Sequence, residues 1–393
     1  MYWNGHQNWN RRTRTLGTIF ATGIALLGAT GCSHLHTKPA DKYVYVTARQ
    51  SFLRDRVAAV SNRTGEVTNG EKLVVLERAR RFVKVRTPNG EVGWIEEKLT
   101  ADQALADKFD QLRVKHLLDP TVGSASARDE VYLHIAPGRE TDRFFRLAEG
   151  DKLSLLTRAI IAKPIPPGAA VAKTAAESKD DAATPLEPVM EDWWLVRDAN
   201  GDTGWIYSHL IDVDAPDALV RYAEGQRIVG AYILAKVEDP DSGMLNAGVA
   251  VTTIPEYVTV LSPYKAGLPY DFDQVRVFTW NLKKHRYETA FREHNVAGYL
   301  PLVISNKTDP YGKGADAATP LPAFSYKVLA ASATIPQPDP ETGTLTPGAT
   351  VTKTYRLEGN ITRRILQPGI PAPEEFHPTP ETDKKDKGKK KKK

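Results

Sequence analysis

The side chains best suited to catalysis or metal binding are few in this sequence, and their spacing assembles no site. Cys32 is the only cysteine among 393 residues, so no internal disulfide can form. His34 and His36 would give a metal two ligands, fewer than a protein zinc site uses. Glu293 and His294 are adjacent, but nothing sets that carboxylate across a substrate cleft from a second one. We therefore expect no catalytic residue, no cofactor and no metal, and we predict that the protein is not an enzyme.

Residues 1–31 have the charge and hydropathy pattern of an export signal. Arg11, Arg12 and Arg14 give a basic start, and residues 16–29 form an uncharged, mostly apolar run. This run is too short to cross a bilayer as a helix, which takes about 20 apolar residues. We therefore expect a cleaved signal peptide and not a membrane span.

Small residues precede Cys32 in the order Ala29-Thr30-Gly31, which resembles the bacterial lipobox. The resemblance implies that Cys32 becomes the lipidated first residue of the mature protein, although Ala29 stands where the family usually has Leu. Lipidation would account for a lone cysteine in an exported chain and would leave no thiolate nucleophile. We expect a lipid-anchored protein on the periplasmic face of the cell envelope. Ser33 is not the acidic residue associated with inner-membrane retention, which favours the outer membrane.

The basic excess lies outside the segments that we expect to fold. The formal net charge is +5, but the leader contributes three arginines and residues 384–393 contribute eight lysines and one aspartate. The remaining body is therefore mildly acidic, which argues against a nucleic-acid-binding fold. The Pro-rich and Lys-rich tail over 366–393 should be disordered, and its lysines should associate with anionic lipid.

A sequence repeat divides the first half of the chain. The pattern Gly-acid-Lys-Leu occurs at 70–73 and 150–153, and the pattern Asn-Gly-acid-x-Gly-Trp-Ile occurs at 89–95 and 200–206. The second copy is longer, and residues 163–190 account for most of the difference. This insertion is rich in Pro and Ala and has no aromatic residue, so we expect a disordered loop.

Each copy has the pattern of a small barrel. Asn-Gly at 89–90 and 200–201 marks a tight turn between two short strands. Residues 82–86 alternate apolar and basic side chains, as a half-buried strand does. Gly93 and Gly204 would suit a bend or a close approach of two backbones. Several short strands per copy would close into a barrel and leave no exposed edge.

These motifs resemble the bacterial SH3 (SH3b) domain family over 43–100 and 129–213. The closing hairpin is the specific part of the match, and residues 52–54 and 132–134 stand where the family has a Leu-Arg-like first strand. The second copy departs from the family pattern by its insertion and by His134 in place of Arg. The resemblance implies two SH3-like β-barrels that bind peptidoglycan or dock other proteins without catalysis.

Four tryptophans are candidate ligand-binding residues. Trp94 and Trp205 occupy the same repeat position, where each either packs the closing hairpin or stacks on a sugar or peptide. Trp193 and Trp194 are adjacent in a predicted strand, so only one of them can face a core. The other should be exposed or covered by the inserted loop, which makes this pair better candidates than Trp205.

The rest of the body is predicted to contain a linker helix and a third β-rich domain. Thr100-Ala101-Asp102-Gln103 resembles a capping box, and apolar residues follow at helical spacing, which predicts a helix over 101–115 within a linker that spans 101–128. Residues 219–365 contain several predicted strands, including a hairpin over 274–291, which we interpret as a β-sandwich-like domain of unknown family. The predicted fold class is mainly β, with two small SH3-like β-barrels followed by this domain. The termini are predicted to be disordered, including a tether over 32–42.

Two classes of function remain open at this stage. In the first, the two barrels recognise peptidoglycan, and the short linker between them raises avidity through effective concentration. In the second, the protein is a scaffold that docks another envelope protein. The sequence does not identify the ligand or the oligomeric state.

Overall fold

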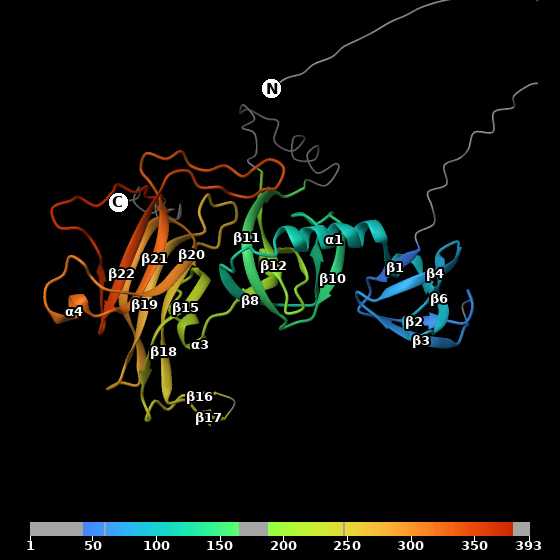
Figure 1. The fold of residues 1–393 in the computed structure, drawn as a ribbon, viewed down its shortest axis with the longest axis horizontal. Coiled ribbons are helices and arrows are strands. Elements are labelled where there is room, and N and C mark those ends of the chain that lie inside the picture. The colour runs from blue at the N-terminus through green and yellow to red at the C-terminus, as the bar shows by residue number, and fades with distance from the viewer. Residues whose placement is uncertain (1–41, 59, 165–187, 247, 380–393) are drawn as a thin grey trace, which may run out of the picture. The chain divides into compact units, whose positions relative to one another are not determined.

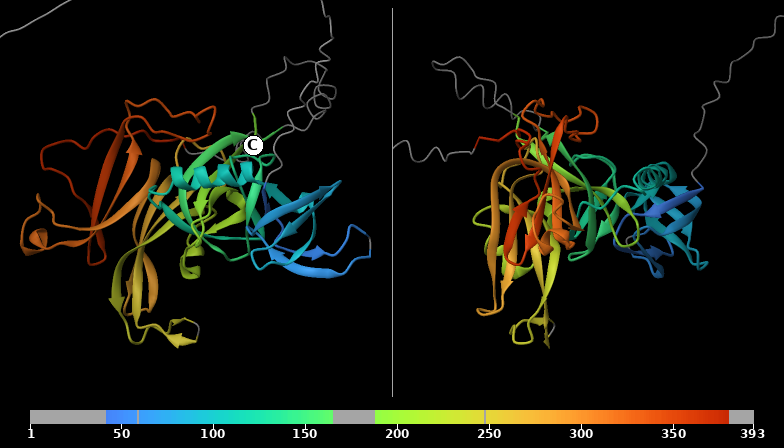
Figure 2. Two further views of the ribbon diagram at one scale, coloured as in Figure 1. Left: turned by 45° about the vertical axis from the view of Figure 1, so that its right-hand side comes forward. Right: turned by 60° about the vertical axis from the view of Figure 1, so that its left-hand side comes forward.

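The computed structural model describes residues 42–58, 60–164, 188–246 and 248–379. Cys32 and the predicted signal peptide, most of the predicted tether, most of the insertion over 163–190 and the lysine tail lie outside the described residues. Residues 41–393 form one compact unit. Figures 1 and 2 show strands throughout the described chain. Most of them belong to three antiparallel sheets of seven strands each, so the mainly β prediction is confirmed. No helix among the described residues is long and apolar enough to cross a membrane.

The first sheet forms a small antiparallel barrel in the order β3-β2-β6-β5-β4-β1-β7. Along β5 and β6, aliphatic residues such as Val83, Val85 and Ile95 alternate with outward-facing residues and fill the core. A 3₁₀-helix, η1, leads from the closing hairpin into the last strand. The elements are β1 (Tyr43–Val46), β2 (Gln50–Arg54), β3 (Arg63–Thr68), β4 (Lys72–Ala79), β5 (Phe82–Arg86), β6 (Val92–Glu96), η1 (Glu97–Leu99) and β7 (Thr100–Asp102).

The second sheet repeats this topology strand for strand, in the order β10-β9-β13-β12-β11-β8-β14. Its core contains Leu133, Val196 and Ile206, which correspond to the buried positions of the first barrel. The main difference lies in β11 and β12, which are longer than their counterparts. The elements are β8 (Gly123–Ala127), β9 (Val131–His134), β10 (Arg143–Leu147), β11 (Lys152–Ala162), β12 (Met190–Arg197), β13 (Thr203–Tyr207), η2 (Ser208–Leu210) and β14 (Ile211–Val213).

Gly93 and Gly204 occupy the same position in the two closing hairpins, and both are required by close packing. An added Cβ would lie 2.7 Å from the Cβ of Leu53 in the first barrel and 2.7 Å from that of Leu133 in the second. Real side chains cannot approach so closely, so only glycine fits. Glycine is thus repeated at this position because the barrel leaves no room for a side chain there.

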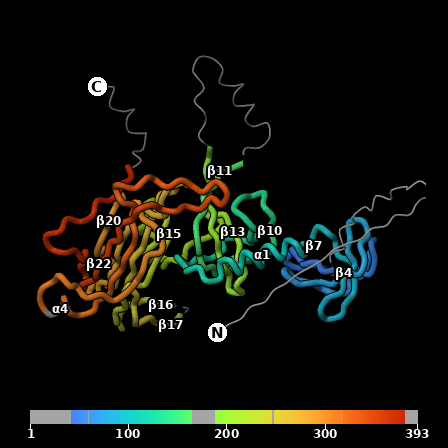
Figure 3. The backbone as a smooth tube through the Cα atoms, turned by 45° about the horizontal axis from the view of Figure 1, so that its top comes forward, coloured from blue at the N-terminus to red at the C-terminus, as the bar shows by residue number. Residues whose placement is uncertain are grey.

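A single helix, α1 (Gln103–Lys115), follows β7, and its backbone can be traced in Figure 3. Phe109 is buried in the core of the second barrel. The predicted capping box is wrong by two residues, because Thr100 belongs to β7. Asp102 is the N-cap instead, and its Oδ1 accepts a hydrogen bond from the backbone N–H of Leu105 at 2.8 Å.

The third domain is one antiparallel sheet with the strand order β15-β18-β19-β20-β21-β22-β23. The predicted β-sandwich-like domain thus has its main strands in one continuous hydrogen-bonded sheet. Each strand pairs with the next along the chain, apart from the small β16–β17 hairpin, and the sheet curls so that β15 contacts β21. The predicted hairpin over 274–291 is present as β19 and β20. The elements are α3 (Asp217–Val220), β15 (Arg227–Glu238), β16 (Leu245–Asn246), β17 (Val249–Ala250), β18 (Thr253–Ser262), β19 (Phe272–Asn281), β20 (Arg286–Lys307), α4 (Ala315–Ala318), β21 (Leu321–Leu329), β22 (Thr350–Glu358) and β23 (Ile361–Arg364).

The predicted disordered tail begins too early, because its described part, 366–379, packs on the third domain. The carboxylate of Glu375 accepts hydrogen bonds of 2.7 and 2.8 Å from the Nζ of Lys353, whose side chain is 1% exposed. Phe376 contacts an apolar cluster, and its backbone N–H donates to the carbonyl of Leu329. A buried ammonium needs carboxylate partners, and a composition rich in proline gives no sign of that requirement.

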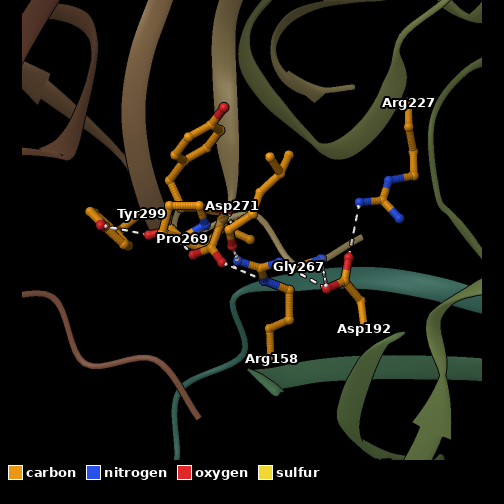
Figure 4. A network of polar contacts seen from close by, with 10 residues as sticks. Arg158, Asp192, Arg227, Gly267, Pro269, Asp271 and Tyr299 are labelled. Carbon is orange, nitrogen blue, oxygen red and sulfur yellow. Dashed lines mark hydrogen bonds and ion pairs between the residues drawn. The ribbon is translucent and has the colours of Figure 1, made fainter. Parts of the chain in front are cut away.

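A buried ion-pair network joins the second barrel to the third domain (Figure 4). The guanidinium of Arg158 in β11 donates to the carboxylates of Asp192 and Asp271 at 3.2 and 3.0 Å. It also donates to two backbone carbonyls of the third domain, those of Leu268 and Tyr270, at 2.8 and 2.7 Å. The side chains of Arg158 and Asp192 are 6% and 1% exposed, so this contact is fully desolvated.

Candidate ligand-binding face of the first barrel

The outer face of the first barrel's closing hairpin gathers aromatic and charged side chains. Because side chains alternate along a strand, Phe82 and Lys84 of β5 point outward beside the buried Val83 and Val85. Trp94 and Glu96 of β6 point the same way, and Arg54 ends the neighbouring strand β2. We call these five residues, Arg54, Phe82, Lys84, Trp94 and Glu96, the open face.

Strand register places Trp94 at the centre of the open face. Trp94 pairs with Lys84 on one side and with Arg54 on the other. The Nζ of Lys84 lies 5.8 Å from the centroid of the Trp94 ring. Trp94 is half-buried, so part of its ring remains accessible to a ligand.

A pocket of about 360 Å³ lies at one end of the open face. Arg54, Phe82 and Glu96 line it together with Val57 and Ala58, which belong to the loop between β2 and β3. An aromatic ring, a cation and a carboxylate thus border one concave, partly apolar surface. Such a combination suits a small ligand that has both a flat or apolar part and polar groups.

The carboxylate of the open face has a cationic partner, but its two cations have no carboxylate partner among the described residues. Glu96 forms an ion pair of 2.7 Å with Lys98. Arg54 donates to the hydroxyl of Ser61 at 3.0 Å, and Lys84 lies opposite Glu77 of β4 without forming an ion pair with it. Among the described residues, therefore, neither Arg54 nor Lys84 has a carboxylate partner.

The corresponding face of the second barrel has a different composition. The repeat and the strand register give the equivalent residues without ambiguity. In the order Arg54, Phe82, Lys84, Trp94 and Glu96, they are His134, Trp193, Leu195, Trp205 and Tyr207. We call this set the covered face, because Trp193, Leu195 and Trp205 are at most 6% exposed.

The covered face is closed by neighbouring parts of the chain. Arg139, in the loop over 135–142, lies over the Tyr207 ring at 4.7 Å from its centroid and forms an ion pair of 2.9 Å with the buried Glu191. The His134 ring meets Trp193 edge-on, with 5.3 Å between ring centroids. Leu112 of α1 packs on the same cluster. Burial also lowers the pKa of His134, so its imidazole is neutral near pH 7.

The predicted site residues thus fall in two groups. Trp94 lies on the open face with its ring partly accessible, whereas Trp205 is buried. Neither Trp193 nor Trp194 is exposed, at 1% and 7%, and the alternative that the insertion covers one of them falls mostly outside the described residues. Trp194 belongs to the core of the second barrel, and Trp193 is buried in a second cluster with Leu195 and Trp205, on which Leu112 packs. Cys32 lies outside the described residues.

Sequence reasoning did not single out Arg54, Phe82 and Lys84 as site residues. The signal was available, because the alternation over 82–86 already assigned Phe82 and Lys84 to the outer side of a half-buried strand. What was missing was the neighbour relation between strands, which only the register supplies. The described residues also contain no group of three or more His, Cys, Asp or Glu side chains that could hold a metal ion.

Comparison with known families agrees with this geometry. Residues 52–101 match one family model described as a bacterial SH3 domain, and residues 167–212 match a second model with the same description. The chain therefore contains two bacterial SH3 domains. Domains of this family are typically non-catalytic, and they suggest binding of peptidoglycan or protein. No curated protein matches the chain.

Similarity to solved structures is remote. An NlpC/P60 family protein from Bacillus cereus is 14% identical, with a TM-score of 0.21, over 46% of this chain and 62% of that protein. NlpC2 from Trichomonas vaginalis is 10% identical, with a TM-score of 0.14, over 47% of this chain and 54% of that protein. The chain spans less than two thirds of either structure's length, and likeness at these TM-scores carries no weight for function.

Proposed function

We propose that this protein is a non-catalytic binding protein of the bacterial cell envelope, whose first barrel recognises peptidoglycan through the open face. We further propose that a lipid on Cys32 holds it at the periplasmic face of a membrane, with the outer membrane favoured. The observation that carries the binding proposal is the contrast between the open face and its covered equivalent in the second barrel.

The accessible ring of Trp94 supports a wall ligand. Because Trp94 is only half-buried, part of its ring is free to stack on a ligand. Sugar rings and short peptides both offer a flat or apolar side with polar edges, which matches a ring flanked by Arg54 and Lys84. The pocket at the end of the face has room for a small part of such a ligand.

The two barrels have different roles in this proposal. Two identical binding surfaces would gain avidity, but the second barrel buries the residues that correspond to Trp94 and Phe82. Its β11 instead carries Arg158 and anchors the third domain. We therefore assign ligand binding to the first barrel, and we assign to the second barrel the task of holding the third domain.

A sedimentation experiment tests the binding proposal. The unit 41–393 should pellet with isolated peptidoglycan and should release no soluble fragments from it during a long incubation. Protein that stays in the supernatant over ordinary pH and salt would refute wall binding. Release of fragments would show instead that the protein is a hydrolase.

Docking of another envelope protein is the second candidate function, and the covered face favours it. In the second barrel, the position equivalent to the open face contacts other parts of the chain, namely Leu112 of α1 and Arg139 of the loop over 135–142. The same position in the first barrel could therefore accept a segment of a partner protein. Cross-linking in intact cells through a photoreactive amino acid at position 82 distinguishes the two: wall fragments on the adduct support the first function, and a single partner protein supports the second.

The proposed anchor has its own test. Cys32→Ser should abolish labelling of the full chain by a radioactive fatty acid in growing cells, while Ser33→Ala should leave labelling unchanged. A wild-type chain that takes up no label would refute the anchor without affecting the binding proposal.

A further inference from the structure

The open face differs from its covered equivalent mainly in charge. Two cations of the first barrel, Arg54 and Lys84, correspond to His134 and Leu195 in the second. Leu195 is fully buried, and His134 is held neutral by burial. The positive charge is therefore confined to the barrel whose face is accessible, at the two positions that flank the central tryptophan.

A third cation near this face, Arg63, has an equivalent in the second barrel and provides a comparison for Arg54 and Lys84. The guanidinium of Arg63 lies 3.8 Å from the centroid of the Phe52 ring, and the equivalent Arg143 lies 5.1 Å from that of Tyr132. This stacked pair occurs in both barrels, so it belongs to the fold. Arg54 and Lys84 have no such counterpart, which indicates that their charge serves a task of the first barrel alone.

We infer that the open face binds a carboxylate group of its ligand between Arg54 and Lys84, with the apolar part of the ligand against Trp94. This inference rests on the proposed function and names the chemical class: a carboxylate-bearing peptide or sugar of the wall. Both cations lie next to Trp94 in the register, and neither forms an ion pair with a described carboxylate. A carboxylate could accept charge-assisted hydrogen bonds from both at once.

The neighbouring acids restrict which end of the face can receive an anion. Glu96 borders the pocket but is paired with Lys98 at 2.7 Å, and Glu77 lies opposite Lys84. Glu77 and Trp94 lie on opposite sides of Lys84 in the register, so the carboxylate belongs on the Trp94 side, in the Arg54–Trp94–Lys84 row. The uncharged part of the ligand then extends toward Phe82 and the pocket.

Two forms of the wall test this inference. Peptidoglycan is first stripped of phosphodiester polymers, so that carboxylates are its main anions. The preparation is then divided, and the carboxylates of one portion are amidated with a carbodiimide and ammonium chloride. The unit 41–393 should bind the untreated wall at least tenfold more tightly than the amidated wall. Arg54→Gln and Lys84→Gln should each weaken binding to the untreated wall by about tenfold, and the double variant should no longer distinguish the two walls.

The control for a general charge effect is Lys327→Ala, which removes one exposed cation from β21 of the third domain. This variant should bind like the wild type, and all variants should melt at the same temperature. Equal binding of the wild type to both walls would overturn the inference and leave the proposed function intact. No binding to either wall would overturn both. If Lys327→Ala weakens binding as much as Lys84→Gln does, the effect depends only on the total charge of the protein, and the inference is also overturned.

Discussion

Replacing Arg158 by Met should uncouple the third domain from the second barrel. The substitution keeps most of the side-chain volume but removes the guanidinium from between Asp192 and Asp271. Two carboxylates would then lack their main cation, and the carbonyls of Leu268 and Tyr270 would lose their donor. Asp192 keeps only Arg227 at 3.7 Å and the backbone N–H of Gly267.

The expected loss follows from burial. Removing one partner of a buried ion pair costs about 3–5 kcal/mol, because an uncompensated charge stays in the interior. Urea unfolding of 41–393, monitored by tryptophan fluorescence, should therefore show a free energy of unfolding that is lower by about that amount. The single transition of the wild type should split into two, one for the second barrel and one for the third domain. Arg158→Met combined with Asp192→Asn and Asp271→Asn should recover much of the loss, since the buried charges are then absent.

A surface pair provides the matched control. Arg128 and Asp212 in the second barrel form an ion pair with side chains 56% and 60% exposed, so Arg128→Met should cost less than about 1 kcal/mol. A loss below about 1 kcal/mol for Arg158→Met as well, with a single unchanged transition, would refute the assigned role of the network.

Three further predictions test other parts of the structure. Ending the chain at residue 365 removes Glu375 from the buried Lys353, which keeps Glu293 as a partner, and should destabilise the third domain by about 1.5–3 kcal/mol in calorimetry. An unchanged melting temperature would show that 366–379 does not pack on this domain. Asp102→Ala removes the N-cap of α1 and should cost about 1 kcal/mol in urea unfolding, whereas Thr100→Ala should cost less. Burial, with the nearby Asp198 charge, raises the pKa of Asp202 from 3.8 to about 6, so the charged form opposes folding and stability should fall as pH rises from 4 through 6. Asp202→Asn should therefore stabilise the protein at pH 7 by about 1 kcal/mol, a value reduced for partial solvent exposure, and should give no gain at pH 4; an equal gain at both values would contradict this pKa.

The features predicted from sequence are those set by local chemistry. The Asn-Gly turns, the glycines at 93 and 204 and the alternation along β5 each follow from steric or periodic rules, and two copies of the motif reinforced one another. The single curled sheet of the third domain could not be predicted, because strand periodicity does not say which strands pair. The partners of Lys353 and Arg158 were also hidden, since each lies far along the chain from the residue it binds.

The candidate site was only partly accessible to sequence reasoning for a related reason. The repeat identified Trp94 and Trp205 as equivalent, but equivalence in sequence does not imply equal exposure. Trp205 is buried in a cluster on which Leu112 packs, and Arg139 lies over the neighbouring Tyr207. Both Leu112 and Arg139 lie outside the repeated motif. The rule that adjacent strand residues face opposite sides held for Trp193 and Trp194, yet a cluster on each side buried both.

The most direct test of the account is the binding isotherm of 41–393 on purified peptidoglycan, compared with that of Trp94→Ala. We predict saturable binding by the wild type and a loss of about tenfold or more in the variant, which should still unfold cooperatively although loss of a half-buried ring lowers its melting temperature. Tyr264→Ala, which removes a 74% exposed aromatic ring from the third domain, should bind like the wild type. A Trp94→Ala protein that binds as tightly as the wild type would contradict the assignment of the open face as the binding site.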